Sequence, residues 1–457
     1  MRSESGMFND FSVRGAWGLP GQANQSSGTL RFSNEGIELQ LDHALFIPGL
    51  GSAWTPGCVK EPVIVGHSND GDRWTIVDAQ FHRWSGNEPI LVARAVLRGE
   101  CIQDVNDLPL RKAVLEFTHL KEWTGKQIYV DKKTSGIVAV SAPDEPEVVI
   151  NVQDIPGIKN LVLDSGVAQS FDPTRITMTT HRRFHVEFEP DGTLSSVTQV
   201  MRQLSGLLTF LVGRAVYPQS AHLLGRSMDE TKHPPIEYLL PLRAGPIRER
   251  SGFQMILPYK MLEGLGAETL FARWFSSEET LRPVTDLLLT TFYYASPYTQ
   301  STFLSLAQAM ESFHRRTREG LYVSTDEYEK IKTSVSACIP PDAATKIRGK
   351  LQGMMEWGNE FSLKDRLREL FETHDAQMLL DLSGQIDIKE FVRLLCDTRN
   401  YLTHYKGYKP KVIDSIHEMY NLNQRMRAIL VLMILKYLGI PEVAVFLPLK
   451  GDLGLVA

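Results

Sequence analysis

Cysteine is scarce in this chain of 457 residues, which has only four, at positions 58, 101, 338 and 396. Their spacing contains no C-x-x-C pair, which argues against zinc ribbons and dithiol redox sites. A disulfide framework is not expected in a chain of this length, so cysteine usage favours a reducing compartment.

Long apolar runs are also missing. The most apolar stretch, residues 428–438, is about half as long as a membrane span and contains Lys436. Residues 1–20 lack the apolar centre of a secretory signal peptide. We therefore expect a cytoplasmic protein that does not enter a membrane.

The chain has no excess of positive charge: 49 Lys and Arg face 54 Asp and Glu, a net charge of −5. A nucleic-acid site must then be local, because such proteins usually carry a strongly basic domain. The phosphate loop, the G-x-G-x-x-G turn, H-E-x-x-H and G-x-S-x-G are all missing, which argues against the enzyme classes that use them. We expect no metal and no cofactor.

The first part of the chain has the period-two alternation of β-strands. Residues 30–32 and 37–41 alternate around a turn at 34–36, which predicts a hairpin. Other strand-like runs cover residues 74–81, 90–97, 113–117, 148–152 and 175–188. Strands without helices between them predict an antiparallel sheet, sandwich or barrel.

Helical periodicity replaces this alternation after residue 192. Ser195 or Ser196 is expected to cap a helix that continues to Leu211, and a mixed region then follows, with another helix opening at Ser277.

From about residue 297 the sequence predicts helices alone. One covers 303–313 and ends near Gly320, and Ser362 and Asp387 should begin two more, the latter from 388 to about 405. A fourth uses apolar positions from 412 to 437. We predict an α+β multidomain chain with a four- or five-helix bundle at its end. The expected parts are residues 1–195 (β-rich), 196–295 (mixed) and 296–457 (bundle).

One polar segment stands out at the end of the third bundle helix, residues 397–405 (DTRNYLTHY). Arg399 and His404 form an R-x4-H pair. RNA cleavage without a metal needs an imidazole to move protons at the ribose 2′-hydroxyl or the leaving oxygen. It also needs a guanidinium to hold the phosphate. These two residue types make the segment a candidate nuclease site.

The spacing limits how this pair can work. Five residues advance about 500° around a helix, so Arg399 and His404 lie about 140° apart. Either the helix distorts near His404, or two copies of the chain share the work. Asn400 lies four residues before His404 and could orient its imidazole. His404 also belongs to the last helical turn, where free carbonyls favour a protonated imidazole suited to a general acid.

The string alone is weak, because similar pairs also occur at Arg175/His181, Arg226/His233 and Arg368/His374. Context favours Arg399/His404: residues 391–411 hold five basic residues against one acidic residue, a net charge of +4. The basic residues are Arg393, Arg399, Lys406, Lys409 and Lys411. An alternative is a surface arginine and a helix-terminal histidine that stabilises the last carbonyls.

Several blocks resemble one known family. Residues 303–316 (FLSLAQAMESFHRR), 361–371 (FSLKDRLRELF) and 399–405 (RNYLTHY) are similar to the HEPN domain of ApeA-like bacterial defence proteins. Residues 11–20 (FSVRGAWGLP), 28–32 and 36–39 resemble the ApeA amino-terminal domain. The order and spacing of these blocks are far more specific than R-x4-H.

The resemblance implies a metal-independent endoribonuclease that acts as a dimer or larger homo-oligomer, with two R-x4-6-H motifs meeting at an interface. It implies Arg399 and His404 as the catalytic pair and Asn400 as the polar residue after the arginine. Glu311 matches an acidic position near HEPN sites, although it could equally be an i, i+4 partner of Arg315. Tyr405 is a further supporting candidate, and Arg393, Lys406 and Lys409 are candidate RNA contacts.

The resemblance also implies antiphage defence by abortive infection, with host RNA, and transfer RNA in particular, as the target. From its position, the amino-terminal region is expected to sense a phage-derived trigger. One alternative is a HEPN module that binds RNA or protein without catalysis.

Another alternative is a carbohydrate-binding β-domain, suggested by Trp17, Trp54, Trp74, Trp84 and Trp123. Such tryptophans more often fill a β core. Met354, Met355, Met426 and Met433 are likewise expected to fill the core rather than to bind a cofactor.

Overall fold

The structure is a computed structural model in which the chain forms two compact units, Met1–Ser276 and Ser277–Ala457. It describes residues 6–45, 60–86, 88–125, 129–132, 138–141, 148–150, 157–172, 175–226, 234–245, 247, 250–294, 298–340, 344–404, 412–413 and 415–453. Trp54, Tyr405, Lys406, Lys409 and Lys411 lie outside these residues. The three-part division at residues 195 and 295 stays a prediction.

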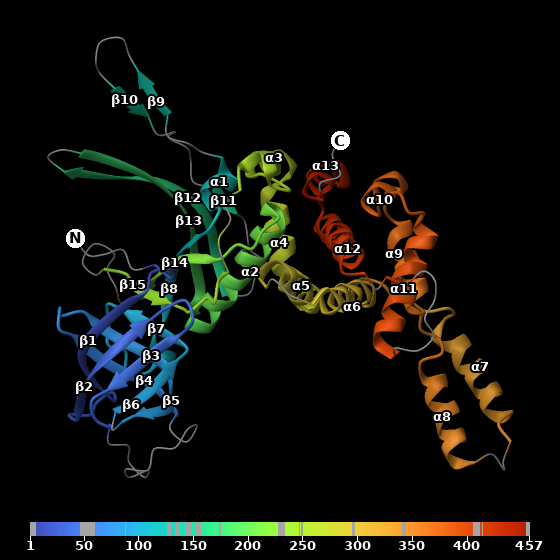
Figure 1. Ribbon diagram of the computed structural model, residues 1–457, viewed down its shortest axis with the longest axis horizontal. Helices are drawn as coiled ribbons and strands as arrows, with labels where there is room; N and C mark the ends of the chain where they lie inside the picture. Colours follow the sequence, from blue (N-terminus) through green and yellow to red (C-terminus); the bar gives the residue numbers. More distant parts are fainter. Residues whose placement is uncertain are drawn as a thin grey trace. The chain divides into compact units, whose positions relative to one another are not determined.

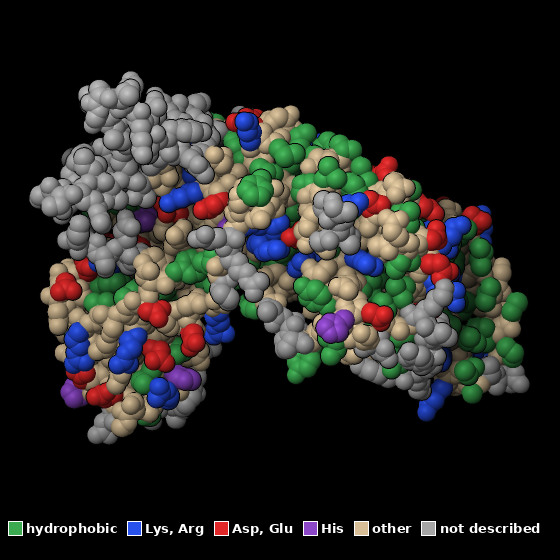
Figure 2. Space-filling view, turned by 45° about the horizontal axis from the view of Figure 1, so that its top comes forward, with side chains coloured by type: hydrophobic (Ala, Val, Ile, Leu, Met, Phe, Trp, Pro, Cys, Tyr) green, Lys and Arg blue, Asp and Glu red, His purple; other side chains and the backbone are tan. Residues whose placement is uncertain are grey.

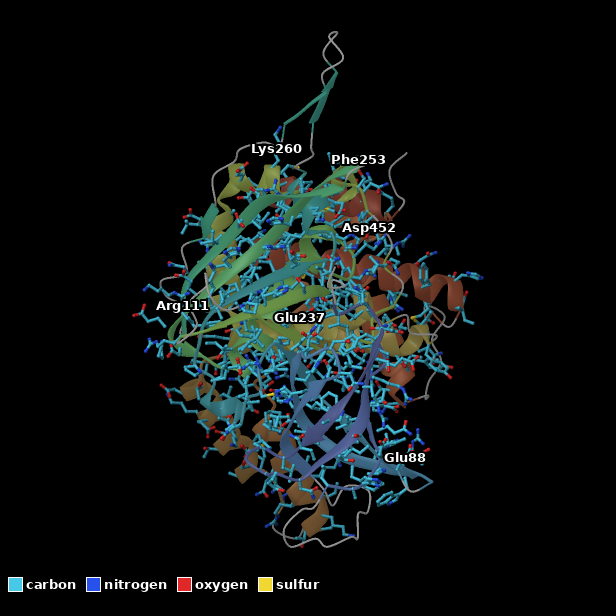
Figure 3. All side chains as sticks on the ribbon, turned by 90° about the vertical axis from the view of Figure 1, so that its left-hand side faces the viewer. Glu88, Arg111, Glu237, Phe253, Lys260 and Asp452 are labelled. Atoms are coloured by element: carbon cyan, nitrogen blue, oxygen red, sulfur yellow. The ribbon has the colours of Figure 1, made fainter. Side chains whose placement is uncertain are left out.

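The first unit is built on a large antiparallel sheet (Figure 1). Its barrel strands are β1 (Phe11–Gly18), β2 (Gln25–Phe32), β3 (Ile37–Leu41), β4 (Lys60–Ser68), β5 (Arg73–Ser85) and β6 (Glu88–Ala93). Strand β5 pairs with both β4 and β6, which closes these six strands into a barrel. The hairpin predicted around residues 34–36 is confirmed, because Phe32 pairs with Ile37. At one end of the barrel Glu88, labelled in Figure 3, accepts a hydrogen bond from Gln40.

The sheet continues beyond the barrel through β7, β15, β14, β8, β13, β12 and β11 in that order. Their bounds are β7 (Ala95–Arg98), β8 (Leu110–Phe117), β11 (Val148–Ile150), β12 (Gly157–Asp172), β13 (Arg175–Gly192), β14 (Pro218–Gly225) and β15 (Ile236–Leu239). Two further strands, β9 (Tyr129–Lys132) and β10 (Val138–Ser141), form a separate pair. The predicted antiparallel β-rich region is therefore confirmed.

Helices cover part of this sheet. They are α1 (Leu120–Thr124), α2 (Leu194–Val212), α3 (Tyr259–Leu265) and α4 (Ala267–Ser276), with short 3₁₀ turns at Val105–Asp107 and Gly252–Gln254. Helix α2 packs against β8 and β13. The prediction that Ser195 or Ser196 caps α2 is wrong. Thr193 has the extended backbone of a cap, and its hydroxyl accepts a hydrogen bond of 3.2 Å from the Ser196 amide.

Three tryptophans fill the interior of this unit, as expected for a β core. Trp17, Trp74 and Trp123 are at most 2% exposed. The indole of Trp17 donates to the Gly28 carbonyl over 3.1 Å, and that of Trp123 donates to the Leu257 carbonyl over 2.8 Å. Buried in this way, they offer no platform on which a sugar could stack, and only Trp84 is exposed among the described tryptophans of this unit.

The second unit is helical, as predicted. Its helices are α5 (Glu278–Tyr293), α6 (Thr299–Thr317), α7 (Thr325–Ala337), α8 (Thr345–Glu356), α9 (Leu363–Glu372), α10 (Ala376–Leu382), α11 (Ile388–His404), α12 (Ile416–Tyr437) and α13 (Glu442–Asp452). Helices α5 and α12 pack on α6, and α9 and α11 pack against each other and on α6. Met426 and Met433 are buried in this core. The expectation of core positions for Met354 and Met355 is wrong, because Met354 is 62% exposed and α8 has no buried residue.

The predicted starts of two bundle helices are confirmed. The Ser362 hydroxyl accepts from the Asp365 amide over 3.3 Å at the start of α9, and Asp387 accepts from the Lys389 amide over 2.9 Å at the start of α11. The fourth predicted helix begins later than expected. Val412 and Ile413 precede it, and α12 starts at Ile416 after the cap residue Ser415.

Candidate active site

Helix α11 carries the R-N-x-x-x-H motif. Its apolar side is buried against the bundle through Phe391, Val392, Leu395 and Leu402. This packing leaves Arg399 half-buried at the edge of the helix, while Asn400 and His404 are exposed. His404 is the last residue of the helix. The hydrophobic pattern of α11 therefore fixes which parts of the motif face the bundle and which face solvent.

Arg399 lines a cavity of about 560 Å³ within the helical unit. Helix α6 supplies Glu311 and Arg315 to the same cavity, α9 supplies Leu363, and α11 adds Thr403. Two guanidinium groups and one carboxylate thus border one space. Guanidinium groups bind phosphate through charge-assisted hydrogen bonds, so this cavity suits an anionic ligand better than a neutral one.

Arg399 and Arg315 differ in their partners. Arg315 pairs with Glu311 over 3.2 Å and also with Glu360. Arg399 donates to the neutral amide oxygen of Asn400 over 3.3 Å, and it has no ion pair within the described residues. The structure thus shows the Glu311–Arg315 pair and also places Glu311 in the cavity that Arg399 lines. Of the two cations, Arg399 is the one without an ion pair among the described residues.

A buried polar cluster, which the sequence interpretation missed, lies between α6 and α9. Arg366 is only 1% exposed. Its guanidinium donates to Glu360 over 2.9 Å and to His314 Nδ1 over 3.1 Å. Because arginine has only donors, His314 Nδ1 must accept, and its Nε2–H then donates to Glu369 over 2.7 Å. Burial lowers the pKa of His314, which keeps the ring neutral.

This cluster supports the wall of the cavity. Glu360 accepts from both Arg366 and Arg315, so it links the buried cluster to a residue that lines the cavity. A sequence signal for the cluster did exist. His314 follows Ala307 and Met310 at the inward spacing of α6, and Arg366 directly precedes the inward Leu367 on α9.

The structure separates the two ends of the motif. His404 is not among the residues that line the cavity, and no hydrogen bond joins Asn400 to His404 in the described part of the chain. Asn400 instead bonds Arg399. A single copy therefore presents Arg399 in the cavity and His404 outside it, in the manner expected from a separation of about 140° on one helix.

The positive charge expected around Arg399 is weaker at Arg393 than the sequence suggested. Arg393 lies 3.9 Å from Glu390 and 3.7 Å from Asp397, so nearby carboxylates offset its charge. Lys406, Lys409 and Lys411 of the predicted basic patch, and Tyr405, fall outside the described residues. Burial raises the pKa of the neighbouring Cys396 to about 11, so this thiol is protonated at neutral pH and is no nucleophile.

The competing pair Arg368/His374 has a structural role. Arg368 is near Asp365 at 3.7 Å, and His374 is buried and hydrogen-bonded to Glu442. Burial lowers the pKa of His374, as it does for His314. Within the described residues, no group of three or more His, Cys, Asp or Glu side chains is arranged to hold a metal ion.

Two family models match the chain. One, described as Apea-like HEPN, covers residues 304–443, and the other, ApeA N-terminal domain 1, covers residues 12–268, more than half of the chain. The chain belongs to the ApeA family. It is thus a HEPN-family defence protein, and HEPN domains are generally ribonucleases. No curated protein and no solved structure matches the chain.

The family matches follow the two units of the structure. The ApeA N-terminal match lies within Met1–Ser276, and the HEPN match lies within Ser277–Ala457. The HEPN match contains the cavity, the buried cluster and the whole R-x4-H motif. Among the helices that the structure describes, none combines the length and the apolar character needed to cross a bilayer.

Proposed function

We propose that this ApeA-family chain is a metal-independent endoribonuclease that acts in the cytoplasm and stops phage infection by cleaving host RNA, transfer RNA in particular. The observation that carries the proposal is the position of Arg399. It lines a cavity of about 560 Å³ beside a second arginine and has no carboxylate partner among the described residues. A phosphodiester is the ligand that such a site fits best.

The proposed reaction is an attack of a ribose 2′-hydroxyl on its own phosphodiester. The new bond joins the 2′-oxygen to phosphorus, and the bond from phosphorus to the 5′-oxygen breaks. The proton leaves the 2′-hydroxyl, and another is delivered to the 5′-oxygen, so the products are a cyclic phosphate and a 5′-hydroxyl. His404 moves a proton as general acid or base. Arg399 binds the phosphate oxygens as their charge grows.

Two copies of the chain complete the site in this proposal. One copy presents Arg399 inside the cavity and His404 outside it, so a second copy facing the first can bring a histidine to the arginine. Glu311, Asn400 and Tyr405 are proposed to support the pair, and Arg393, Lys406 and Lys409 to contact the RNA. The amino-terminal unit is proposed to sense a phage-derived trigger.

Purified protein tests the chemistry directly. We expect the wild type to cleave a transfer-RNA pool equally well with and without EDTA. Arg399→Ala and His404→Ala should each lower the cleavage rate by about 10²–10⁴-fold, the range for lost acid–base or oxyanion catalysis. Arg368→Ala, from the competing pair on α9, should keep the wild-type rate. Loss of activity on chelation would refute metal independence.

A second function is favoured by the exposed position of His404. A module that binds RNA or protein without cleaving it needs only the cavity and its arginines. In that case Arg399→Ala would weaken RNA binding, while His404→Ala would leave binding unchanged and no variant would cleave RNA.

A further inference from the structure

Helices α7 and α8 form a hairpin, here called the arm (residues 325–356), that projects from the rest of the helical unit in Figure 1. Neither helix has a buried residue. They are 13 and 12 residues long, a length at which isolated helices are marginal in water. The two helices of the arm therefore gain little stability from burial within the single chain.

The contact between the two helices of the arm is mostly polar. Tyr328 donates to the Met355 carbonyl over 2.7 Å, Lys332 pairs with Glu356 at 3.0 Å, and Ser336 donates to the Met355 sulfur over 3.7 Å. Tyr328, Lys332 and Ser336 are spaced four residues apart, so they mark the face that α7 turns toward α8. This seam buries little apolar surface.

A separate apolar face runs along the arm beside this seam. Its residues are 39% to 62% exposed: Ile331, Val335, Ile347, Leu351 and Met354. Ile331 and Val335 each precede a seam residue of α7 by one position, and Met354 likewise precedes Met355 on α8. On each helix the apolar residues are therefore rotated about 100° in the same direction from the residues that face the other helix. Because the two helices are antiparallel, this rotation places both apolar stripes on the same side of the hairpin. Figure 2 shows hydrophobic side chains gathered at the right-hand edge, where the arm lies.

Charge is unevenly distributed along the arm. The base, where α7 begins and α8 ends, carries four acidic residues, Asp326, Glu327, Glu329 and Glu356, and the basic residues Lys330 and Lys332 follow on α7, which leaves a net charge of −2. Lys332 pairs with Glu329 and Glu356. The first half of α8, near the tip, carries only basic charge, from Lys346, Arg348 and Lys350. Two arms placed side by side in opposite directions would pair each basic tip with an acidic base. Arms placed in the same direction would face like charges.

We infer that the arm docks on the arm of a second copy of this chain, in antiparallel orientation and with the two apolar faces in contact. The contact is isologous, since each arm presents the same surface to the other. Each hairpin then supplies half of a four-helix bundle. No described residue of the arm lines the Arg399 cavity, so this interface is distinct from the one in the proposed nuclease site and does not rest on it.

The test of the apolar face measures the mass of the full-length protein across a range of concentrations by sedimentation. Ile331→Glu with Leu351→Glu should weaken self-association at least 100-fold and halve the mass of the assembly. The control is Val443→Glu with Leu447→Glu, two residues four apart on α13 that are 71% and 66% exposed, which should keep the wild-type mass. Circular dichroism checks that both variants stay folded. An unchanged mass for the arm variant, or a monomeric wild type, would overturn the inference.

Charge exchange tests the antiparallel orientation. Lys346→Glu with Lys350→Glu, and Glu327→Lys with Glu329→Lys, should each weaken self-association about tenfold or more. Mixing these two variants, or combining all four substitutions in one chain, should restore it. In the chain with all four substitutions the tip is acidic and the base is basic. Opposite charges then face each other only if the tip of one arm meets the base of the other. If the tip variant loses RNA binding while its mass stays that of the wild type, the arm serves RNA and the inference is wrong.

Discussion

At the scale of single residues, the partners of each arginine separate the candidate catalytic group from the structural ones. Arg315 is bound by Glu311 and Glu360, and Arg366 is bound by Glu360 and His314. Their charges are balanced inside the protein. Arg399 bonds only a neutral amide among the described residues, so its charge is available to a phosphate.

The residues of this site differ in how well the sequence could reveal them. Arg399 and His404 were identified because both lie in one short polar segment with a recognisable spacing. The cluster of His314, Arg366 and Glu369 was missed because His314 lies more than 50 residues before the other two and meets them only after α6 and α9 pack. Contacts of that kind depend on tertiary structure, which local spacing does not report.

Burial of His314 predicts a pH dependence of stability. Its pKa is lowered in the folded state, so below about pH 6.5 the unfolded chain takes up a proton that the folded chain does not. The free energy of unfolding should therefore fall as the pH falls from 7.5 to 5.5. The slope should approach about 1.4 kcal/mol per pH unit for each such histidine.

Urea unfolding of the helical unit at several pH values measures this slope. His314→Gln should flatten it, whereas His417→Gln, a change at an exposed position of α12, should leave it as in the wild type. A slope unchanged by His314→Gln would show that the buried cluster does not take part.

At the scale of elements, sequence patterns were most informative where several local signals agree on an element with one buried side. The hairpin of β2 and β3 and the starts of α9 and α11 were predicted because alternation, periodicity and capping residues agree there. The hairpin of α7 and α8 was missed because neither helix buries a residue, so no inward stripe marks it. Helix α13 was missed as well, and it contains Pro448, which sequence reading takes as a helix breaker.

Strands β1 and β4 of the barrel approach each other closely at Gly66. A Cβ atom added at Gly66 of β4 would lie 2.3 Å from Trp17 Cε3 and 2.6 Å from the Ala16 carbonyl oxygen of β1. Gly66→Ala should lower the free energy of unfolding of the first unit by about 1–3 kcal/mol or more, because neither backbone nor a buried indole can move aside.

Gly36→Ala is the matched control for this prediction. Gly36 lies in the turn between β2 and β3, and nothing lies within 4 Å of an added Cβ. Its free energy of unfolding should stay within about 0.5 kcal/mol of the wild-type value. Equal midpoints for both variants in thermal unfolding would contradict the close packing of β1 on β4.

The start of α9 offers a second test at this scale. Ser362 accepts from the Asp365 amide, and its hydroxyl, with that of Tyr322, lowers the pKa of the Asp365 carboxyl. Ser362→Ala should lower the stability of the helical unit by about 1 kcal/mol, the usual cost of a lost cap, while Ser362→Thr should lower it much less. Chemical unfolding of the two variants compares them directly.

At the scale of the whole molecule, the account requires that two copies build one site. If His404 of one copy serves Arg399 of another, a mixture of Arg399→Ala and His404→Ala proteins contains mixed dimers with one intact site. Cleavage should then return to about one quarter of the wild-type rate, since half of the dimers are mixed and half of their sites are complete. A mixture as inactive as its two components would mean that each copy uses its own pair.

The cleavage of RNA in cells tests the central claim most directly. Wild type, Arg399→Ala, His404→Ala and the control Arg368→Ala would be expressed at matched levels, with and without phage, and small RNA would be sequenced for new 5′-hydroxyl ends. The account predicts discrete ends in transfer RNA with the wild type and the control, and none with the two motif variants. If no such ends appear under phage challenge while the motif variants still protect the cells, the nuclease assignment is wrong.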